Sequence, residues 1–252
     1  MTEGGHGGAL DFSEILGHHL VDHKVAAIGL TKHMLMIAIA AFLTAAVIIT
    51  AARTRGRLRT AVEAFIAFIR KDIADPALGD DAGFYLPYLL TLFVFILIMN
   101  LLGLIPSGAT PTGNISVTLS LSLLTFVLIH GAGVMRHGLG HHLKNFVPHG
   151  VPWWAWPLVW AIEAMGYLTK AIALCIRLFA NMTAGHMVIL LFLGLILLAG
   201  QTSLWSGLVV APIAVGLAVG LYALELIVAL IQAYVFTMLT AIFVGGALHP
   251  EH

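Results

Sequence analysis

The fold is decided by the stretch WWAWPLVWAIEAMGYLTKAIALCIRLFANMTAGHMVILLFLGLILLAG, residues 153–200. This stretch is apolar almost throughout, and as one helix it would be about 70 Å long, because each helical residue adds about 1.5 Å. A helix that crosses a bilayer at right angles needs only about 30 Å. Residues 204–248 form a second apolar run of similar length. We therefore predict a hairpin of two long helices, which either contain kinks or lie strongly tilted in a membrane.

The composition of the chain is that of a membrane protein. Of its 252 residues, 60% are hydrophobic and 10% are charged, and the mean hydropathy is +1.00. Ordinary soluble domains are about 25% charged, and disordered chains have low hydrophobicity. Nucleic-acid binders need a basic excess, whereas here 12 Lys and Arg residues balance 12 Asp and Glu residues. The single cysteine, Cys175, excludes a disulfide-stabilised scaffold.

Three shorter apolar runs precede the long pair. Residues 33–52, 84–105 and 115–135 are each close to the length of about 20 residues that spans a bilayer. A polar segment, residues 1–31, comes before them. Together with the two long runs they predict an all-α membrane protein with about five transmembrane helices, folded as a single integral membrane domain over residues 1–252.

The arginines after the first span predict the orientation of the chain. Arg53, Arg55, Arg57 and Arg59 follow that span directly. Short loops rich in Lys and Arg face the cytoplasm. We therefore expect the N-terminus outside and the C-terminus in the cytoplasm.

A further helix is predicted between the first two spans. Residues 60–73 place Phe65, Phe68 and Ile69 at helical spacing, with charged residues near the end of the segment. The segment is too short to cross a bilayer. We expect an amphipathic helix that lies at the cytoplasmic interface.

Few polar side chains lie inside the long runs, and their spacing groups them. Glu163, Lys170 and Arg177 are seven residues apart, which is nearly two helical turns, so they point the same way. Asn181 extends this stripe, whereas His186, nine residues after Arg177, faces elsewhere.

The last run carries a matching pair. Glu225 and Gln232 are also seven residues apart and share a face of the helix, and Tyr222 lies one turn before Glu225. Counted from a turn near Gln201, His186 and Glu225 lie toward the outside and the remaining pair of Arg177 and Gln232 lies deeper. The pattern predicts one fixed cation at depth, with two protonatable groups between it and one surface.

Arg177 is the fixed charge in this pattern. Arginine stays protonated because its pKa is above about 12, and at mid-membrane it costs about 2.5–3.5 kcal/mol on insertion scales. Glu and His can pass protons on. Burial raises the pKa of a glutamate, and histidine titrates near neutral pH. The anionic partner of Arg177 must come from another subunit, or Glu225 must reach it.

Each of these residues also has a purely structural interpretation. Arg177 could pair with Glu225 across the hairpin, and Glu163 and Lys170 could snorkel or bond to neighbouring helices. Three further side chains could simply join packed helices by hydrogen bonds: His186, Asn181 and Gln232.

A histidine group after the third span raises the question of a metal site. It comprises His137, His141, His142 and His149 in a Gly-rich segment without a nearby Cys or carboxylate. This donor set and spacing do not match known zinc sites. We expect no metal and no cofactor, and we expect Cys175 to serve packing.

Two segments resemble a known family. Residues 177–186, RLFANMTAGH, closely resemble the signature of subunit a of rotary F-type ATP synthases, and residues 100–106, NLLGLIP, resemble a second stretch of that family. Residues 110–119 resemble the family's segment after that second stretch, and the polar residues of the long runs fall at the family's spacings. The resemblance covers the chain from about residue 84 onward.

The resemblance implies a stator proton channel in the Fo sector. Subunit a lies against a ring of c subunits, and two offset half-channels lead protons to and from the ring carboxylates. The arginine that resembles Arg177 separates these half-channels and engages the carboxylates. His186 and Glu225 would line the outer half-channel. Gln232 would help to hold Arg177, and Asn181 would belong to the same polar layer. Glu163 and Lys170 would lie nearer the cytoplasmic exit.

The same resemblance implies partners and a location. The partners would be the c-ring, the b-type subunits of the peripheral stalk, other ATP synthase subunits and membrane lipids, with the proton as the transported ion and no nucleic acid. The location would be the bacterial inner membrane. The chain would be a component of the enzyme and not catalytic alone, since it has no Gly-rich nucleotide loop.

One departure from the common bacterial pattern is informative. Many bacterial members have Glu at the last position of the signature and His on the final helix, whereas this chain has His186 and Glu225. The mitochondrial type has this exchanged form, so the chain resembles alphaproteobacterial and mitochondrial members. The exchange keeps one acid and one imidazole, and no cluster of oxygen ligands favours sodium over protons.

Two other classes of function remain as alternatives. A self-contained ion-coupled transporter often shows internal repeats and broken helices at the midplane, and this sequence shows no repeat. A haem anchor or membrane scaffold would need histidines paired at matching depths, for which His130 and His186 are the candidates.

Overall fold

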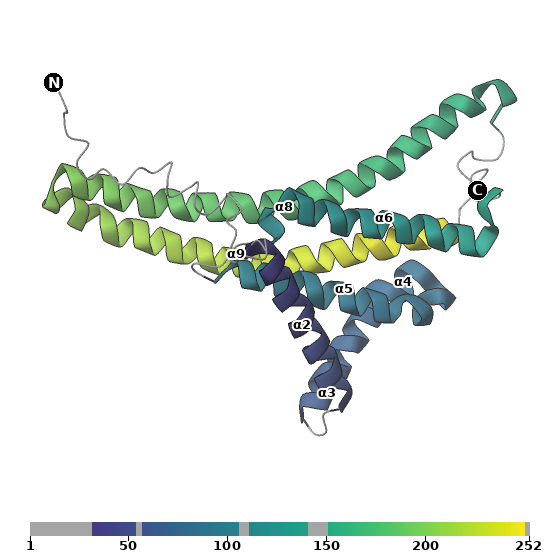
Figure 1. The fold of residues 1–252 in the computed structure, drawn as a ribbon, viewed down its shortest axis with the longest axis horizontal. Helices are drawn as coiled ribbons and strands as arrows, with labels where there is room; N and C mark the ends of the chain where they lie inside the picture. The colour runs from purple at the N-terminus through teal and green to yellow at the C-terminus, as the bar shows by residue number, and fades with distance from the viewer. Residues whose placement is uncertain (1–31, 54–56, 106–110, 141–150, 250–252) are drawn as a thin grey trace, which may run out of the picture.

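A computed structural model of the chain describes residues 32–53, 57–105, 111–140 and 151–249 (Figure 1). The polar segment predicted over residues 1–31 lies outside these ranges. Within them the secondary structure is helical, and no strand occurs. The elements are α2 (Lys32–Arg53), α3 (Arg57–Phe68), the π-helix Ile69–Ala74, α4 (Asp75–Leu78), the 3₁₀ turn Gly79–Asp81, α5 (Ala82–Gly103), the 3₁₀ turn Pro111–Gly113, α6 (Ile115–His137), the 3₁₀ turn Trp153–Ala155, α8 (Trp156–Thr202) and α9 (Leu204–Leu248).

The predicted fold class is confirmed. Within the described residues, five helical runs are long and apolar enough to cross a membrane. α8 extends over 47 residues and α9 over 45. Figure 1 shows α8 bent along its length, while α9 continues through Pro212 without a break. The tilt of the pair in a membrane remains a prediction.

The turn of the hairpin is very tight. Only Ser203 separates the two helices, and its side-chain oxygen accepts a hydrogen bond of 3.1 Å from the backbone N–H of Ser206. A serine at this position caps the first turn of α9 because it satisfies an N–H that has no partner within the helix. The Ser206 hydroxyl in turn donates to the carbonyl of Ala199, at 2.6 Å. These bonds join the end of α8 to the start of α9.

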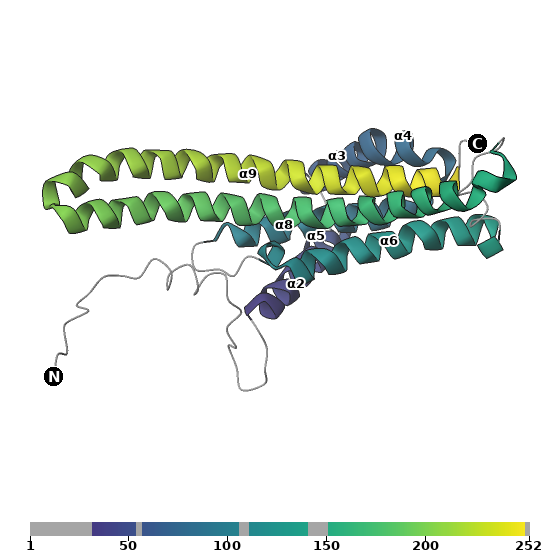
Figure 2. The same ribbon diagram turned by 90° about the horizontal axis from the view of Figure 1, so that it is seen from above.

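The bundle covers only one half of the hairpin. α5 and α6 both pack against α9, and α6 also packs against α8. The buried residues of α8 all lie between Leu174 and Met182. Figures 1 and 2 both show the turn end of the hairpin extending well beyond the other helices. The long hairpin therefore presents most of its apolar surface outward.

The predicted helix over residues 60–73 is amphipathic in the structure. α3 passes into a π-helix in which Ile69, Ile73 and Ala74 are buried, while Arg70 and Lys71 are exposed. The buried face joins the main core and packs against α5 and α9. Its placement at a membrane interface remains a prediction.

The end of α9 is held by contacts from two other elements. His137, the last residue of α6, lies with its Nε2 2.9 Å from the carbonyl oxygen of Leu248. His249 Nε2 lies 3.2 Å from a carboxylate oxygen of Asp81, just before α5. We call this meeting point of α6, α9 and the start of α5 the closed end of the bundle.

Close packing of α4 on α9 depends on a glycine. A Cβ atom added at Gly245 would collide with the carbonyl oxygen of Ala77, whereas a Cβ at the neighbouring Gly246 would meet nothing within 4 Å. Backbone atoms at this point cannot move aside as a flexible side chain would. Gly245 therefore allows the two helices to touch.

We expect Gly245→Ala to destabilise the protein by about 1–3 kcal/mol, which is typical of an overpacked contact. Gly246→Ala is the matched control and should be neutral or slightly stabilising, since Ala favours helix. The measurement is thermal unfolding of the detergent-solubilised protein, followed by circular dichroism. Equal melting temperatures for the two variants would contradict this account of α4.

Candidate functional site

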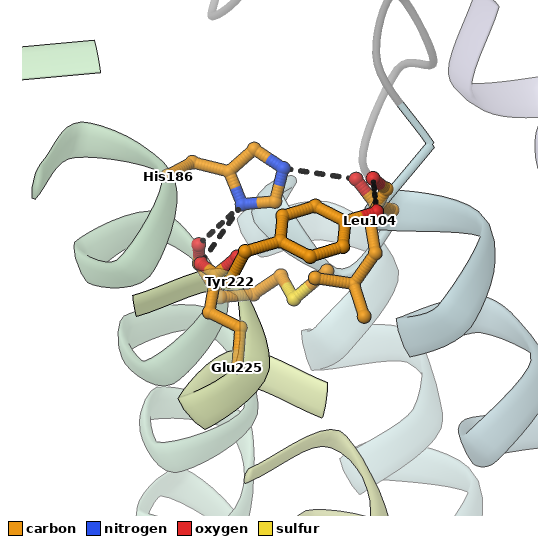
Figure 3. A network of polar contacts seen from close by, with 6 residues as sticks. Leu104, His186, Tyr222 and Glu225 are labelled. Carbon is orange, nitrogen blue, oxygen red and sulfur yellow. Dashed lines mark hydrogen bonds and ion pairs between the residues drawn. The ribbon is translucent and has the colours of Figure 1, made fainter. Parts of the chain in front are cut away.

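Two of the predicted site residues meet at the C-terminal end of α5 (Figure 3). His186 on α8 lies with Nδ1 3.4 Å from a carboxylate oxygen of Glu225 on α9, and Nδ1 is also 3.1 Å from the carbonyl of Met182. Its Nε2 lies 2.9 Å from the carbonyl oxygen of Gly103, the last residue of α5. His186 therefore joins three helices at one point.

Glu225 is the more deeply placed member of this pair. Its side chain is 10% exposed, against 33% for His186. Neither carboxylate oxygen has an aligned hydrogen-bond partner among the described residues, and the contact of 3.4 Å with Nδ1 of His186 is an ion pair only when the imidazole is protonated. The imidazole of His186 is the charged or titratable group that this largely buried carboxylate meets in the described structure.

Glycine at position 185 makes room for this carboxyl group. A Cβ atom added at Gly185 would collide with Oε1 of Glu225. The colliding atom is the end of a flexible side chain, so an alanine here would displace the carboxylate rather than the helices. Gly185 therefore positions Glu225 against His186.

Tyr222 is a further residue of the site that the sequence analysis did not assign to it. Its hydroxyl donates a hydrogen bond of 2.5 Å to the carbonyl of Leu104, immediately after α5 (Figure 3). The last carbonyls of a helix have no partner within the helix. His186 and Tyr222 therefore supply hydrogen bonds to the end of α5. The sequence feature that could have pointed to Tyr222 is its position one helical turn before Glu225, on the same face of the helix.

A pair of amides forms a second link between the long helices. Asn181 Nδ2 donates to Gln232 Oε1 at 2.8 Å. Gln232 is 4% exposed. The polar contact of Gln232 in the structure is with Asn181, and a contact with Arg177 is not among its described interactions.

Asn100 links α5 to α9 in the same layer. Its Nδ2 donates to the carbonyl of Ala229 at 3.3 Å, and the residue is 2% exposed. In the sequence, Asn100 stands out only as the first residue of the stretch NLLGLIP. A lone amide within an apolar run was the signal that it bonds to another helix.

Arg177 is exposed on α8, while the next residue, Leu178, is buried. Within the described parts of the chain Arg177 has no hydrogen bond and no ion pair. The proposed structural pair of Arg177 with Glu225 is not seen, because the ion-pair partner of Glu225 is His186. Arg177 is thus a cation that points away from its own bundle.

Glu163 and Lys170 lie on α8 on the other side of Arg177 from His186. The Lys170 ammonium lies 4.4 Å from the centre of the Tyr167 ring and 5.2 Å from that of Phe243 on α9. Such cation–π contacts stabilise an ammonium group away from water. Both Glu163 and Lys170 are partly exposed, and the structure does not bring them together as a salt bridge.

Among the described residues, no group of three or more His, Cys, Asp or Glu side chains could hold an ion, and the expected absence of a metal stays a prediction. Of the histidine group after α6, His137 binds the end of α9. The other three members lie outside the described ranges. Cys175 is buried, with Sγ 3.4 Å from the hydroxyl of Thr118, which fits its expected packing role.

Comparison with known proteins gives consistent matches. The family described as ATP synthase A chain matches residues 33–245. A protein of Myxococcus xanthus named ATP synthase subunit a is 42% identical over 238 residues, which cover 89% of this chain and 76% of that protein. A Prosthecochloris aestuarii protein named ATP synthase subunit a 2 is 38% identical over 99% of this chain and 83% of its own length. ATP synthase subunit a of a Methylobacterium species is 38% identical, with coverages of 89% and 90%.

The amide link can be tested by a double-mutant cycle on Asn181→Ala and Gln232→Ala. We expect a coupling free energy of about 0.6 kcal/mol and at most about 1.7, the range of hydrogen bonds between helices in membranes. The control cycle combines Asn181→Ala with Thr237→Ala, because the Thr237 hydroxyl donates to the carbonyl of Ala233 within α9. That cycle should be additive. The measurement is the unfolding free energy in detergent micelles, and no coupling in the first cycle would contradict the link.

Proposed function

The chain belongs to the ATP synthase A chain family, and on that premise we propose that it provides two offset half-channels for protons, which Arg177 keeps apart. As a member of this family it is a multi-pass membrane subunit of the proton-conducting part of an ATP synthase, and other subunits of that enzyme are its partners. The finer assignments of residues and routes are our proposals.

The observation that carries the proposal is the isolated charge of Arg177. An exposed arginine at membrane depth costs about 2.5–3.5 kcal/mol on insertion scales unless an anion compensates it. Within the described chain no carboxylate does so. We propose that the compensating anions are the membrane carboxylates of a rotating ring of c subunits, which pass in front of α8 one after another.

Two protonatable groups lie on the same side of Arg177 along the hairpin. His186 lies nine residues away on α8, about 13 Å along the helix, and Glu225 faces it from α9. In our proposal this pair lines the outer half-channel and delivers protons to the ring. Glu163 and Lys170 lie in the opposite direction and belong to the inner half-channel.

The amide layer supports the barrier between the two routes. Asn181 is one turn after Arg177 and is bonded to Gln232, which fixes the distance between α8 and α9 at this depth. One proton crossing 100 mV releases about 2.3 kcal/mol, and a leak past Arg177 would dissipate it. A rigid layer beside a permanent cation opposes such a leak, because a proton cannot pass an arginine that never deprotonates.

The proposal includes the surroundings of the subunit. We propose that the outward apolar face of the long hairpin contacts the c-ring and that b-type subunits of a peripheral stalk and lipids cover other faces. The membrane would be a bacterial inner membrane, with the N-terminus outside and the C-terminus in the cytoplasm. A transporter that acts alone would not need an uncompensated cation on its outer surface, so this alternative has less support.

We expect Arg177→Ala to abolish ATP-driven acidification in inverted membrane vesicles that contain the complete enzyme, because the barrier and the partner of the ring carboxylates are both lost. The measurement is quenching of a pH-sensitive dye after ATP is added. Arg59→Ala is the control, since Arg59 forms an exposed pair with Glu63 and such pairs contribute little. Normal acidification with Arg177→Ala would overturn the proposed function.

We expect Glu225→Gln to slow passive proton flow through vesicles from which the ATP-hydrolysing sector has been removed, by about 100-fold, a typical contribution of one proton-transferring group. Gly185→Ala keeps the carboxyl group but displaces it, so it should cause a smaller loss of the same kind.

The control for the second variant is Gly83→Ala, where an added Cβ meets nothing within 4 Å. It should conduct like the unaltered protein. If Glu225→Gln also conducted normally over the whole pH range, Glu225 would not be part of the route.

A further inference from the structure

We propose that His130, on α6, is a proton-carrying side chain of the inner route, between Arg177 and the closed end of the bundle. This proposal rests on the proposed function, since it concerns the exchange of protons between the ring and the inner side of the membrane. No motif or predicted site residue points to His130 as part of a proton route. His130 lies where α6 packs against α8, on the inner side of Arg177.

His130 belongs to a cluster of rings and charges on three helices. Its ring lies edge-on to Tyr167 of α8 with centroids 5.2 Å apart, and to Phe126 of its own helix at 4.3 Å. The other side of the cluster is Lys170, whose ammonium lies over the rings of Tyr167 and Phe243. Tyr167 thus contacts both an imidazole and an ammonium group.

The cluster lies on the inner side of Arg177. Lys170 is seven residues before Arg177 on α8, about 10 Å along the helix, while His186 is nine residues after it. His130 is seven residues before the end of α6, where His137 meets Leu248 at the closed end. Arg177 therefore has a protonatable cluster on each side, with His186 and Glu225 on one and His130 and Glu163 on the other.

The chemistry of the cluster singles out His130. Tyr167 of α8 faces the His130 ring, and Lys170 of α8 lies on the Tyr167 ring. Glu163 is one turn before Tyr167 on α8, and on the helix of His130 itself Arg136 and His137 follow toward the closed end. α9 contributes the apolar ring of Phe243. Lys, Arg and Tyr side chains ordinarily exchange their protons only above about pH 10. Histidine titrates near neutrality, and it can bind a proton at one ring nitrogen while the other releases one.

Glu163 is the carboxylic acid on this side of Arg177, and a carboxylate is a group that can accept a proton and hand it on. It lies one helical turn before Tyr167 on α8, so it and His130 approach that tyrosine from different helices. In our proposal a proton that leaves the ring carboxylate is taken up by Glu163 or His130 and passes on to the water at the closed end. During ATP-driven pumping the same groups carry protons in the opposite direction, from this water to the ring. His130 supplies the step that is nearer to α6.

The decisive variant is His130→Phe, which keeps a ring for the contacts with Tyr167 and Phe126 but cannot bind a proton. In vesicles that carry the complete enzyme, we expect ATP-driven acidification to slow about tenfold, because Glu163 remains as the other proton-exchanging group. His130→Gln keeps polarity without titration near pH 7 and should slow it to a similar extent. Phe126→Leu is the packing control and should stay within about twofold of the unaltered rate.

The outcomes separate this proposal from its premise. Acidification at the unaltered rate with both His130→Phe and His130→Gln overturns the role of His130, even if Arg177→Ala is inactive as expected. A loss with Phe126→Leu equal to that with His130→Phe also overturns it, because packing alone would then explain the effect. If Arg177→Ala pumps normally, the proposed function falls and this inference falls with it. Immunoblotting of the vesicles for this chain ensures that rates are compared at equal amounts of the protein. Two His130 variants are used so that, if one of them fails to assemble, the other still tests the proposal.

Discussion

The hydrogen bonds at the C-terminal end of α5 are the interaction on which the site depends. In a membrane the backbone carbonyls that a helix leaves unpaired have no water to bind. His186 bonds to Gly103 and Tyr222 bonds to Leu104, so one side chain from each long helix meets this need. The same contact turns the imidazole of His186 toward Glu225. The end of a supporting helix therefore positions the residues of the proposed outer half-channel.

Small side chains at a few positions make the long hairpin possible. Gly185 leaves space for the Glu225 carboxyl group, and Gly245 lets α4 touch α9. Near the turn, a Cβ at Gly207 would lie 3.0 Å from the Cα of Gly200, so the two helices meet there backbone to backbone. Lipid tails are as apolar as leucine, so helices in a membrane associate through such close contacts and through hydrogen bonds between helices.

Much of the architecture could be predicted from the sequence, because the length of an apolar run is a direct measure of what can cross a bilayer. Five spans and a long final pair were expected and are present. The resemblance of residues 177–186 to the ATP synthase subunit a family is confirmed by the family match and the relatives. Contacts between distant segments could not be predicted in this way. Asn100 and Ala229 are far apart in the chain, and no periodicity connects them.

The sequence by itself determined the helices, their lengths and the scarcity of charge that makes each buried polar residue important, because these follow from local composition and spacing. The tertiary structure alone decided which polar residues are partners. It paired Glu225 with His186 instead of Arg177, and it joined Gln232 to Asn181. It also brought His130 to Tyr167 from another helix. The physical reason is that helical spacing fixes the face of a residue on its own helix, whereas its neighbours depend on how three or more helices pack together.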